Sequence, residues 1–190
     1  MTTSATPHLF WITSRAAGFT ALIVSSLAVS VGLLLSTKLA KGRVSDLRVA
    51  HEILSMSALA AIVVHGVTLI GDQYLHPSVL DIAVPFVSGY KSFWTSLGIV
   101  GGWGLLILGL SYYARRFIGG VRWRKLHRFT ALAWLAGLAH SLGEGTDAGQ
   151  AWFLAMVAIV VIPAVALLVR RLWPVPPAAG DRLPRAARAT

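Results

Sequence analysis

The sequence predicts an all-α integral membrane protein, a helical bundle of about five transmembrane helices. Of its 190 residues 56% are hydrophobic and only 13% are charged, and the mean hydropathy is +0.70. Soluble domains carry about 25% charged residues. A formal charge of +10 would favour nucleic acid in a soluble protein. Here the basic residues form blocks between apolar runs, so we interpret the charge as membrane topology, with lipid and not nucleic acid as the partner.

Five apolar runs account for the expected spans, and they cover residues 16–35, 49–70, 93–114, 126–142 and 152–169. A helix that crosses the hydrocarbon core needs about 20 residues. The first run has no basic region before it and no small-residue cleavage site, so we expect a retained helix instead of a signal peptide. Pro163 predicts a kink in the last run. The apolar segment 78–90 is too short to span and is expected to be interfacial or re-entrant.

The charges between the runs predict the orientation. Basic residues concentrate in 38–48, in 115–128 and directly after residue 169, whereas 71–91 and 143–150 are poor in them. Because cytoplasmic loops are enriched in Lys and Arg, we expect a multi-pass protein of the cell inner (cytoplasmic) membrane, with the N-terminus outside and the C-terminus in the cytoplasm. Residues 1–173 form one expected transmembrane domain. Residues 174–190, rich in Pro, Ala and Arg, are expected to be a disordered cytoplasmic tail.

Four histidines lie inside two of these runs. His51 and His65 are fourteen positions apart, and His127 and His140 are thirteen apart. At about 1.5 Å rise per residue, each pair spans roughly 20 Å along a helix. The alternating topology makes the two helices parallel, so His51 and His127 share the cytoplasmic depth and His65 and His140 the outer one. Ionisable or metal-ligating side chains in lipid are treated as functional by default.

Imidazole is a good ligand for haem iron, and two histidines per iron leave no open coordination position, which favours electron transfer. The pattern therefore predicts His51, His65, His127 and His140 as metal ligands of a di-haem core. The chain has no cysteine, which excludes iron–sulfur clusters, thiolate-ligated haem and covalent haem attachment. A haem-free transport or scaffold protein whose histidines relay protons is the alternative from another class, and histidines inside a membrane can also make hydrogen bonds between helices.

Helical phase supports one histidine pair better than the other. Fourteen positions return to within roughly 40° of the same face, whereas thirteen miss it by roughly 140°. His127 and His140 therefore need either different approach directions or a distortion of the helix near Gly137. His8 and His76 have no second histidine at a matching spacing and are not expected to be ligands.

The stretch from Trp123 to Arg128, followed by His140 thirteen positions after His127, resembles the W-R-x-L-H-R segment of the ferric-reductase-like transmembrane domains. The segment from His51 to Gly66 resembles the first ligand helix of that superfamily. Its members include the haem-binding membrane subunit of the bacterial periplasmic methionine-sulfoxide reductase system, eukaryotic ferric reductases and the NADPH oxidases. The likeness covers about residues 11–173. The family core commonly has six spans, whereas this sequence predicts five.

This resemblance implies a membrane cytochrome b in which His51 and His127 bind an inner haem b, and His65 and His140 an outer one. Ferric reductases and NADPH oxidases continue into nucleotide-binding domains, but this chain has no G-x-G-x-x-G, so FAD and NAD(P)H are not expected to bind to it. The electron donor is then a quinol, which makes quinone a further candidate ligand, or a separate flavoprotein. Whether the chain is an enzyme by itself stays open.

A narrower alternative follows from the same resemblance. The chain could be a haem-binding subunit that delivers quinol electrons to one extracytoplasmic reductase, such as a methionine-sulfoxide reductase.

Arginines beside the candidate ligands are further candidates for cofactor binding. Arg124 and Arg128 flank His127, and a guanidinium suits bidentate pairing with a haem propionate. Arg48 and Lys125 are weaker candidates, because a basic cytoplasmic rim is expected from topology anyway. Arg15, near the start of the first run, is either an interfacial arginine or a propionate partner.

Overall fold

The computed structural model describes residues 6–37, 39 and 42–173, and within them all regular structure is helical. The all-α prediction is therefore confirmed for this part of the chain, and the predicted tail 174–190 lies outside it. The elements in chain order are α1 (Thr6–Ser36), α2 (Val44–Leu69), α3 (Val79–Ala83), α4 (Ser92–Leu110), α5 (Arg115–Ile118), α6 (Gly120–His127), α7 (Thr130–Glu144) and α8 (Ala151–Leu172).

Four helices are long and apolar enough to cross a membrane, and they cover His8–Ser36, Val44–Leu69, Ser92–Leu110 and Ala151–Leu172. They match four of the five predicted spans, which supports a multi-pass membrane protein. The fourth predicted span, residues 126–142, differs from the prediction because it does not form one helix. Its main part is α7, whose 15 residues are about 22 Å long, less than the roughly 30 Å of a hydrocarbon core.

The chain breaks between α6 and α7 at Arg128 and Phe129. The backbone N–H of Phe129 donates to the carbonyl of Leu126 at 3.0 Å, three residues back, so the turn is wound more tightly than an α-helix. Of the two alternatives stated for this run, a distortion near Gly137 does not occur, since Gly137 lies inside the regular part of α7. The break instead directly follows His127 and lets that side chain point differently from the rest of α7.

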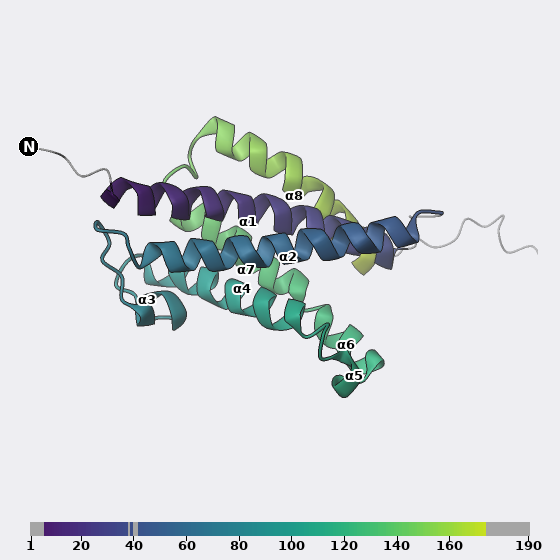
Figure 1. Ribbon diagram of the computed structural model, residues 1–190. Coiled ribbons are helices and arrows are strands. Elements are labelled where there is room, and N and C mark those ends of the chain that lie inside the picture. Colours follow the sequence, from purple (N-terminus) through teal and green to yellow (C-terminus); the bar gives the residue numbers. More distant parts are fainter. Residues whose placement is uncertain (1–5, 38, 40–41, 174–190) are drawn as a thin grey trace, which may run out of the picture.

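Two antiparallel pairs of helices form the bundle. α1 lies along α2, α4 packs against α7, and α8 covers the other side of α1 (Figure 1). The buried indole of Trp134 on α7 donates from Nε1 to Oγ of Ser26 on α1 at 3.0 Å, which joins the two pairs. Trp134 belongs to the hydrophobic core, whose other buried residues are Leu22, Phe153, Val157, Val161 and Ala164.

The segment after α2 folds back onto α4, as the short helix α3 and the loop behind it. Trp103 Nε1 donates to the carbonyl of Ala83 at 2.9 Å, and the backbone N–H of Phe86 donates to Ser96 Oγ at 2.7 Å. The α3 helix has only five residues. This agrees with the prediction of a segment that does not span.

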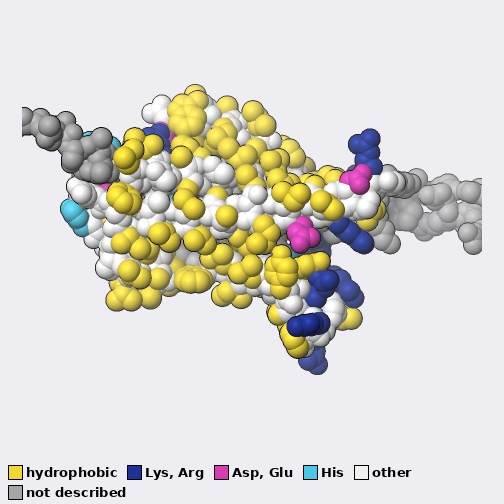
Figure 2. Space-filling model, viewed as in Figure 1, with side chains coloured by type: hydrophobic (Ala, Val, Ile, Leu, Met, Phe, Trp, Pro, Cys, Tyr) yellow, Lys and Arg dark blue, Asp and Glu magenta, His cyan; other side chains and the backbone are white. Residues whose placement is uncertain are grey.

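Charged side chains collect at the ends of the bundle. In the view of Figure 2, the Lys and Arg side chains gather around α5 and α6 and the adjoining end of α2, while the middle of the surface is largely apolar. Many large apolar side chains along the helices are exposed, including Ile53, Val67, Ile107 and Ile159. An apolar belt between polar ends is the surface expected of helices that contact lipid.

Candidate functional site

The four predicted histidines meet in two pairs. The rings of His51 and His127 have their centroids 6.2 Å apart and are inclined by 89° to each other. The rings of His65 and His140 are 6.3 Å apart and inclined by 66°. These are the pairs expected from the predicted depths, while the role of the four residues as ligands stays a prediction.

Hydrogen bonds fix the orientation of three of the four rings. In each, Nδ1 lies against a backbone carbonyl of a neighbouring helix, and because a carbonyl only accepts, Nδ1 carries the hydrogen. Nε2 is then the nitrogen left with a free lone pair. The bonds join His51 to the carbonyl of Ala28 at 3.0 Å, His65 to that of Ser14 at 2.8 Å, and His140 to that of Trp94 at 3.0 Å.

His127 is held differently. Its Nδ1 is buried and has no hydrogen-bond partner among the described residues. The ring instead stacks on the indole of Trp123, with centroids 4.9 Å apart and planes inclined by only 24°. Trp123 is itself fixed, since its Nε1 donates to Ser111 Oγ at 3.2 Å. The backbone of Leu108 on α4 also approaches this ring, so stacking and a weaker backbone contact act together at this histidine.

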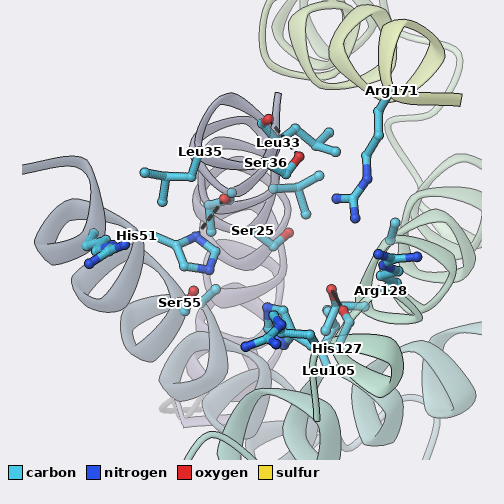
Figure 3. Close-up of a pocket in the computed structure, with 18 of the residues that line it drawn as sticks. Ser25, Leu33, Leu35, Ser36, His51, Ser55, Leu105, His127, Arg128 and Arg171 are labelled. Atoms are coloured by element: carbon cyan, nitrogen blue, oxygen red, sulfur yellow. Dashed lines mark hydrogen bonds between the residues drawn. The ribbon is translucent and has the colours of Figure 1, made fainter. Parts of the chain in front are cut away.

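A cavity of about 550 Å³ lies between His51 and His127. Figure 3 shows both side chains at its wall, one from α2 and one from the end of α6. Apolar side chains such as Ala58, Leu59 and Leu105 form much of the remaining wall. Pockets for small molecules and cofactors have about this volume and this mostly apolar lining.

Four arginines line this cavity as well: Arg48, Arg124, Arg128 and Arg171. The first three come from the predicted basic rim. Arg171 was not among the predicted site residues, because the sequence analysis treated the basic pair after the last run only as a topological stop. It extends from α8 toward the cavity (Figure 3). No local sequence pattern links it to His127, and only the packing of α8 brings them together.

The other polar candidates lie elsewhere. Arg15 forms an ion pair with Asp147 and stacks over the ring of Trp11, with its guanidinium carbon 5.0 Å from the ring centroid. It therefore joins α1 to the loop before α8. His8 and His76 are exposed, as expected for histidines that are not ligands. Lys125 is exposed and does not line the cavity between His51 and His127.

The described residues offer no group of three or more His, Cys, Asp or Glu side chains that could hold a metal ion. Each histidine pair supplies two nitrogen ligands. A structural zinc site needs about four protein ligands and a catalytic one about three. Each pair by itself is therefore short of the ligand number of either kind of zinc site.

Comparison with family models, with curated proteins and with solved structures finds no match to this chain.

Proposed function

We propose that this chain is a membrane b-type cytochrome of the ferric-reductase-like kind, which transfers electrons across the bilayer through two bis-histidine haems. The observation that carries the proposal is the meeting of His51 with His127 and of His65 with His140 inside one bundle of apolar helices. The two pairs lie fourteen residues apart on α2, or roughly 20 Å.

The ring separations suit a shared metal ion. An imidazole nitrogen binds zinc at about 2.0–2.1 Å, and two rings that face one ion of similar size from opposite sides have centroids roughly 6 Å apart. The observed 6.2 and 6.3 Å agree with this value. Edge-to-face aromatic pairs cover a wider range of centroid separations, about 4.5–7 Å.

The hydrogen bonds at Nδ1 support the same role. Metal-ligating histidines donate their second ring N–H to a carbonyl or carboxylate, which fixes the tautomer and raises the basicity of the ligating nitrogen. His51, His65 and His140 make this bond to carbonyls of α1 and α4. A histidine that relays protons needs both nitrogens to exchange partners, and a fixed Nδ1–H hinders that exchange.

The arginines at the inner cavity provide charge for an anionic cofactor. Haem b carries two propionates, and guanidinium groups pair with carboxylates in bidentate geometry. Arg124 and Arg128 come from the helix of His127, and Arg171 adds a third cation from α8. These three are the proposed propionate partners of the inner haem.

When bound, each haem supplies a reversible one-electron couple of its iron. His51 with His127 and His65 with His140 would hold the two groups by imidazole nitrogens, and the apolar helices would surround them. In the proposed topology, α6 and α7 together complete a fifth crossing, the N-terminus is outside, and Arg124 and Arg128 face the cytoplasm. A quinol or a separate flavoprotein donates electrons on one side, and a partner reductase or ferric iron accepts them outside.

The test is the difference spectrum of the purified full-length protein, reduced with dithionite minus oxidised, together with its pyridine haemochrome content. We expect sharp visible bands and two haems b per chain. Colourless protein from haem-replete cells would overturn the proposal and favour the haem-free alternative. Reduction of ferric chelates by the purified protein, given a chemical reductant across a vesicle membrane, would argue against the narrower role as a subunit of one reductase.

A further inference from the structure

Three of the four histidines rest on the same local arrangement of a neighbouring helix. In each case a carbonyl accepts the Nδ1 hydrogen, and the residue four positions further along is a glycine that faces the same imidazole ring. We call this arrangement a carbonyl–glycine seat. The seats are Ser14 with Gly18 for His65, Ala28 with Gly32 for His51, and Trp94 with Gly98 for His140.

Each of these glycines lies too close to its histidine for a side chain. A Cβ atom added to Gly18 would lie 3.1 Å from His65 Nδ1, and one added to Gly32 would lie 3.0 Å from His51 Cε1. At Gly98 it would lie only 2.6 Å from Nδ1 of His140. An alanine at Gly98 therefore has to displace the His140 ring. At Gly18 and Gly32 the facing ring has to move by only a few tenths of an ångström.

The seats repeat with the spacing of the histidines. Gly18 and Gly32 are fourteen residues apart on α1, as His51 and His65 are on the antiparallel α2. On α4, fourteen residues after the carbonyl of Trp94 is Leu108, and the position four further on is Tyr112 instead of glycine. The histidine at that level is His127, whose Nδ1 has no partner among the described residues.

Other glycines of α4 show that close helix packing alone does not explain the seats. A Cβ on Gly101 would meet backbone atoms of Ala133 and Gly137, and one on Gly104 would meet the Ala133 side chain. These glycines allow α4 to approach α7. The seat glycines instead face imidazole rings.

We infer that Gly18, Gly32 and Gly98 are positioning residues that fix the tautomer and ring orientation of His65, His51 and His140. The inference rests on the proposed function only in taking the free Nε2 as the ligand of haem iron. At the level of His127 the backbone of Leu108 approaches the ring but the glycine is missing, and Trp123 stacks on that ring. The outer site thus has two seated histidines, and the inner site has one.

The test replaces each seat glycine with alanine in the full-length protein, with Gly66→Ala and Gly137→Ala as matched controls. Both control glycines are in the same helices as the histidines, and a Cβ there meets nothing within 4 Å. Haem content, midpoint potentials and low-temperature electron paramagnetic resonance spectra are measured. We expect Gly98→Ala to lower the content from two haems to one by loss of the outer haem. Gly18→Ala and Gly32→Ala should keep both haems but shift the resonance of the outer and the inner haem, respectively.

A second measurement determines the histidine tautomers in protein that contains no haem. In haem-free protein labelled with ¹⁵N-histidine, the nitrogen shifts should assign the Nδ1–H tautomer to His51, His65 and His140, and Gly98→Ala should change the shifts of His140 alone. If the wild-type protein contains no haem, the proposed function is overturned. The nitrogen shifts then still test whether the carbonyl–glycine seats fix the histidine tautomers. Wild type with two haems and seat variants indistinguishable from the controls would overturn the inference. If Gly98→Ala does not fold, Gly18→Ala and Gly32→Ala still test the inference in the same way.

Discussion

Trp123 stacks on His127 with ring centroids 4.9 Å apart, a stacking contact with tryptophan that none of the other three candidate ligands makes among the described residues. An aromatic stack contributes about 0.5–1.5 kcal/mol and restrains the tilt of a ring, but it does not fix a tautomer. The orientation of His127 is therefore set by a different physical interaction from that of its partner His51. The two ends of the bundle differ in this respect.

Replacing Trp123 with leucine should disturb the inner site alone. Without the stack, His127 gains rotational freedom, so we expect a broadened or shifted resonance of the inner haem and an unchanged outer haem. Trp123→Phe keeps a stacking ring and is the matched control, with a smaller effect expected. A redox titration followed by low-temperature spectra measures both haems separately. An equal change at both haems would contradict a local role of Trp123.

Alanine at each candidate ligand tests the pairing. His51→Ala and His127→Ala should each remove the same haem, and His65→Ala and His140→Ala should each remove the other, because iron that loses one of two protein ligands binds far more weakly. The readout is pyridine haemochrome content with the α-band position of the haem that remains. His76→Ala is the control and should keep both haems, since this side chain is exposed. Loss of different haems within one pair would mean that the pairing is wrong.

Neutralising the cavity arginines should lower the midpoint potential of the inner haem. A nearby positive charge stabilises the reduced iron relative to the oxidised one, so Arg124→Gln, Arg128→Gln and Arg171→Gln should each shift the potential downward, on the order of tens of millivolts. Arg122→Gln is the matched control, since Arg122 is exposed on α6 and does not line this cavity. Potentiometric titration at two salt concentrations measures the shift. A control variant that shifts as much as the others would point to surface charge in general.

The cap of α3 should respond to acid. The hydroxyl and the backbone N–H of Ser78 donate to the carboxylate of Asp81 at 2.7 and 2.8 Å, and these bonds hold the pKa of Asp81 below its usual value. A carboxylate with a lowered pKa stabilises the folded form above its unfolded-state pKa of about 3.9, and this contribution is lost as the pH falls through the lower folded value. Ser78→Ala should raise the pKa of Asp81 toward about 3.9. Carboxyl titration by nuclear magnetic resonance measures it, and an unchanged midpoint would contradict the role of Ser78.

The pattern along the chain was sufficient to predict much of the fold. Long apolar runs predicted four of the spanning helices, because the length and hydropathy of a helix in lipid are properties of one segment. The depths of His51, His65, His127 and His140 followed from their distance along each run. Their meeting in two pairs also needed the break between α6 and α7, because thirteen positions on one continuous helix would point His127 and His140 to different faces.

Other features depended on how segments rotate and pack against each other. The break at Arg128 and Phe129 was not predicted, because periodicity assumes one continuous helix. Arg171 lines the inner cavity because of where α8 packs. No local sequence pattern encodes that position. Gly18 and Gly32 are fourteen residues apart in the sequence. Their contact with the histidines could not be predicted from this spacing, because it depends on which side of α1 faces α2.

The sequence by itself thus determined that the protein is helical, apolar enough for lipid, and supplied with imidazoles at two depths, since composition and spacing act along one dimension. Tertiary structure alone decided which nitrogen is free in three of the four rings, which glycines adjoin those rings, and which arginines face the inner cavity. Those properties depend on contacts of a few ångströms between helices far apart in the chain, and such contacts follow from packing and not from periodicity.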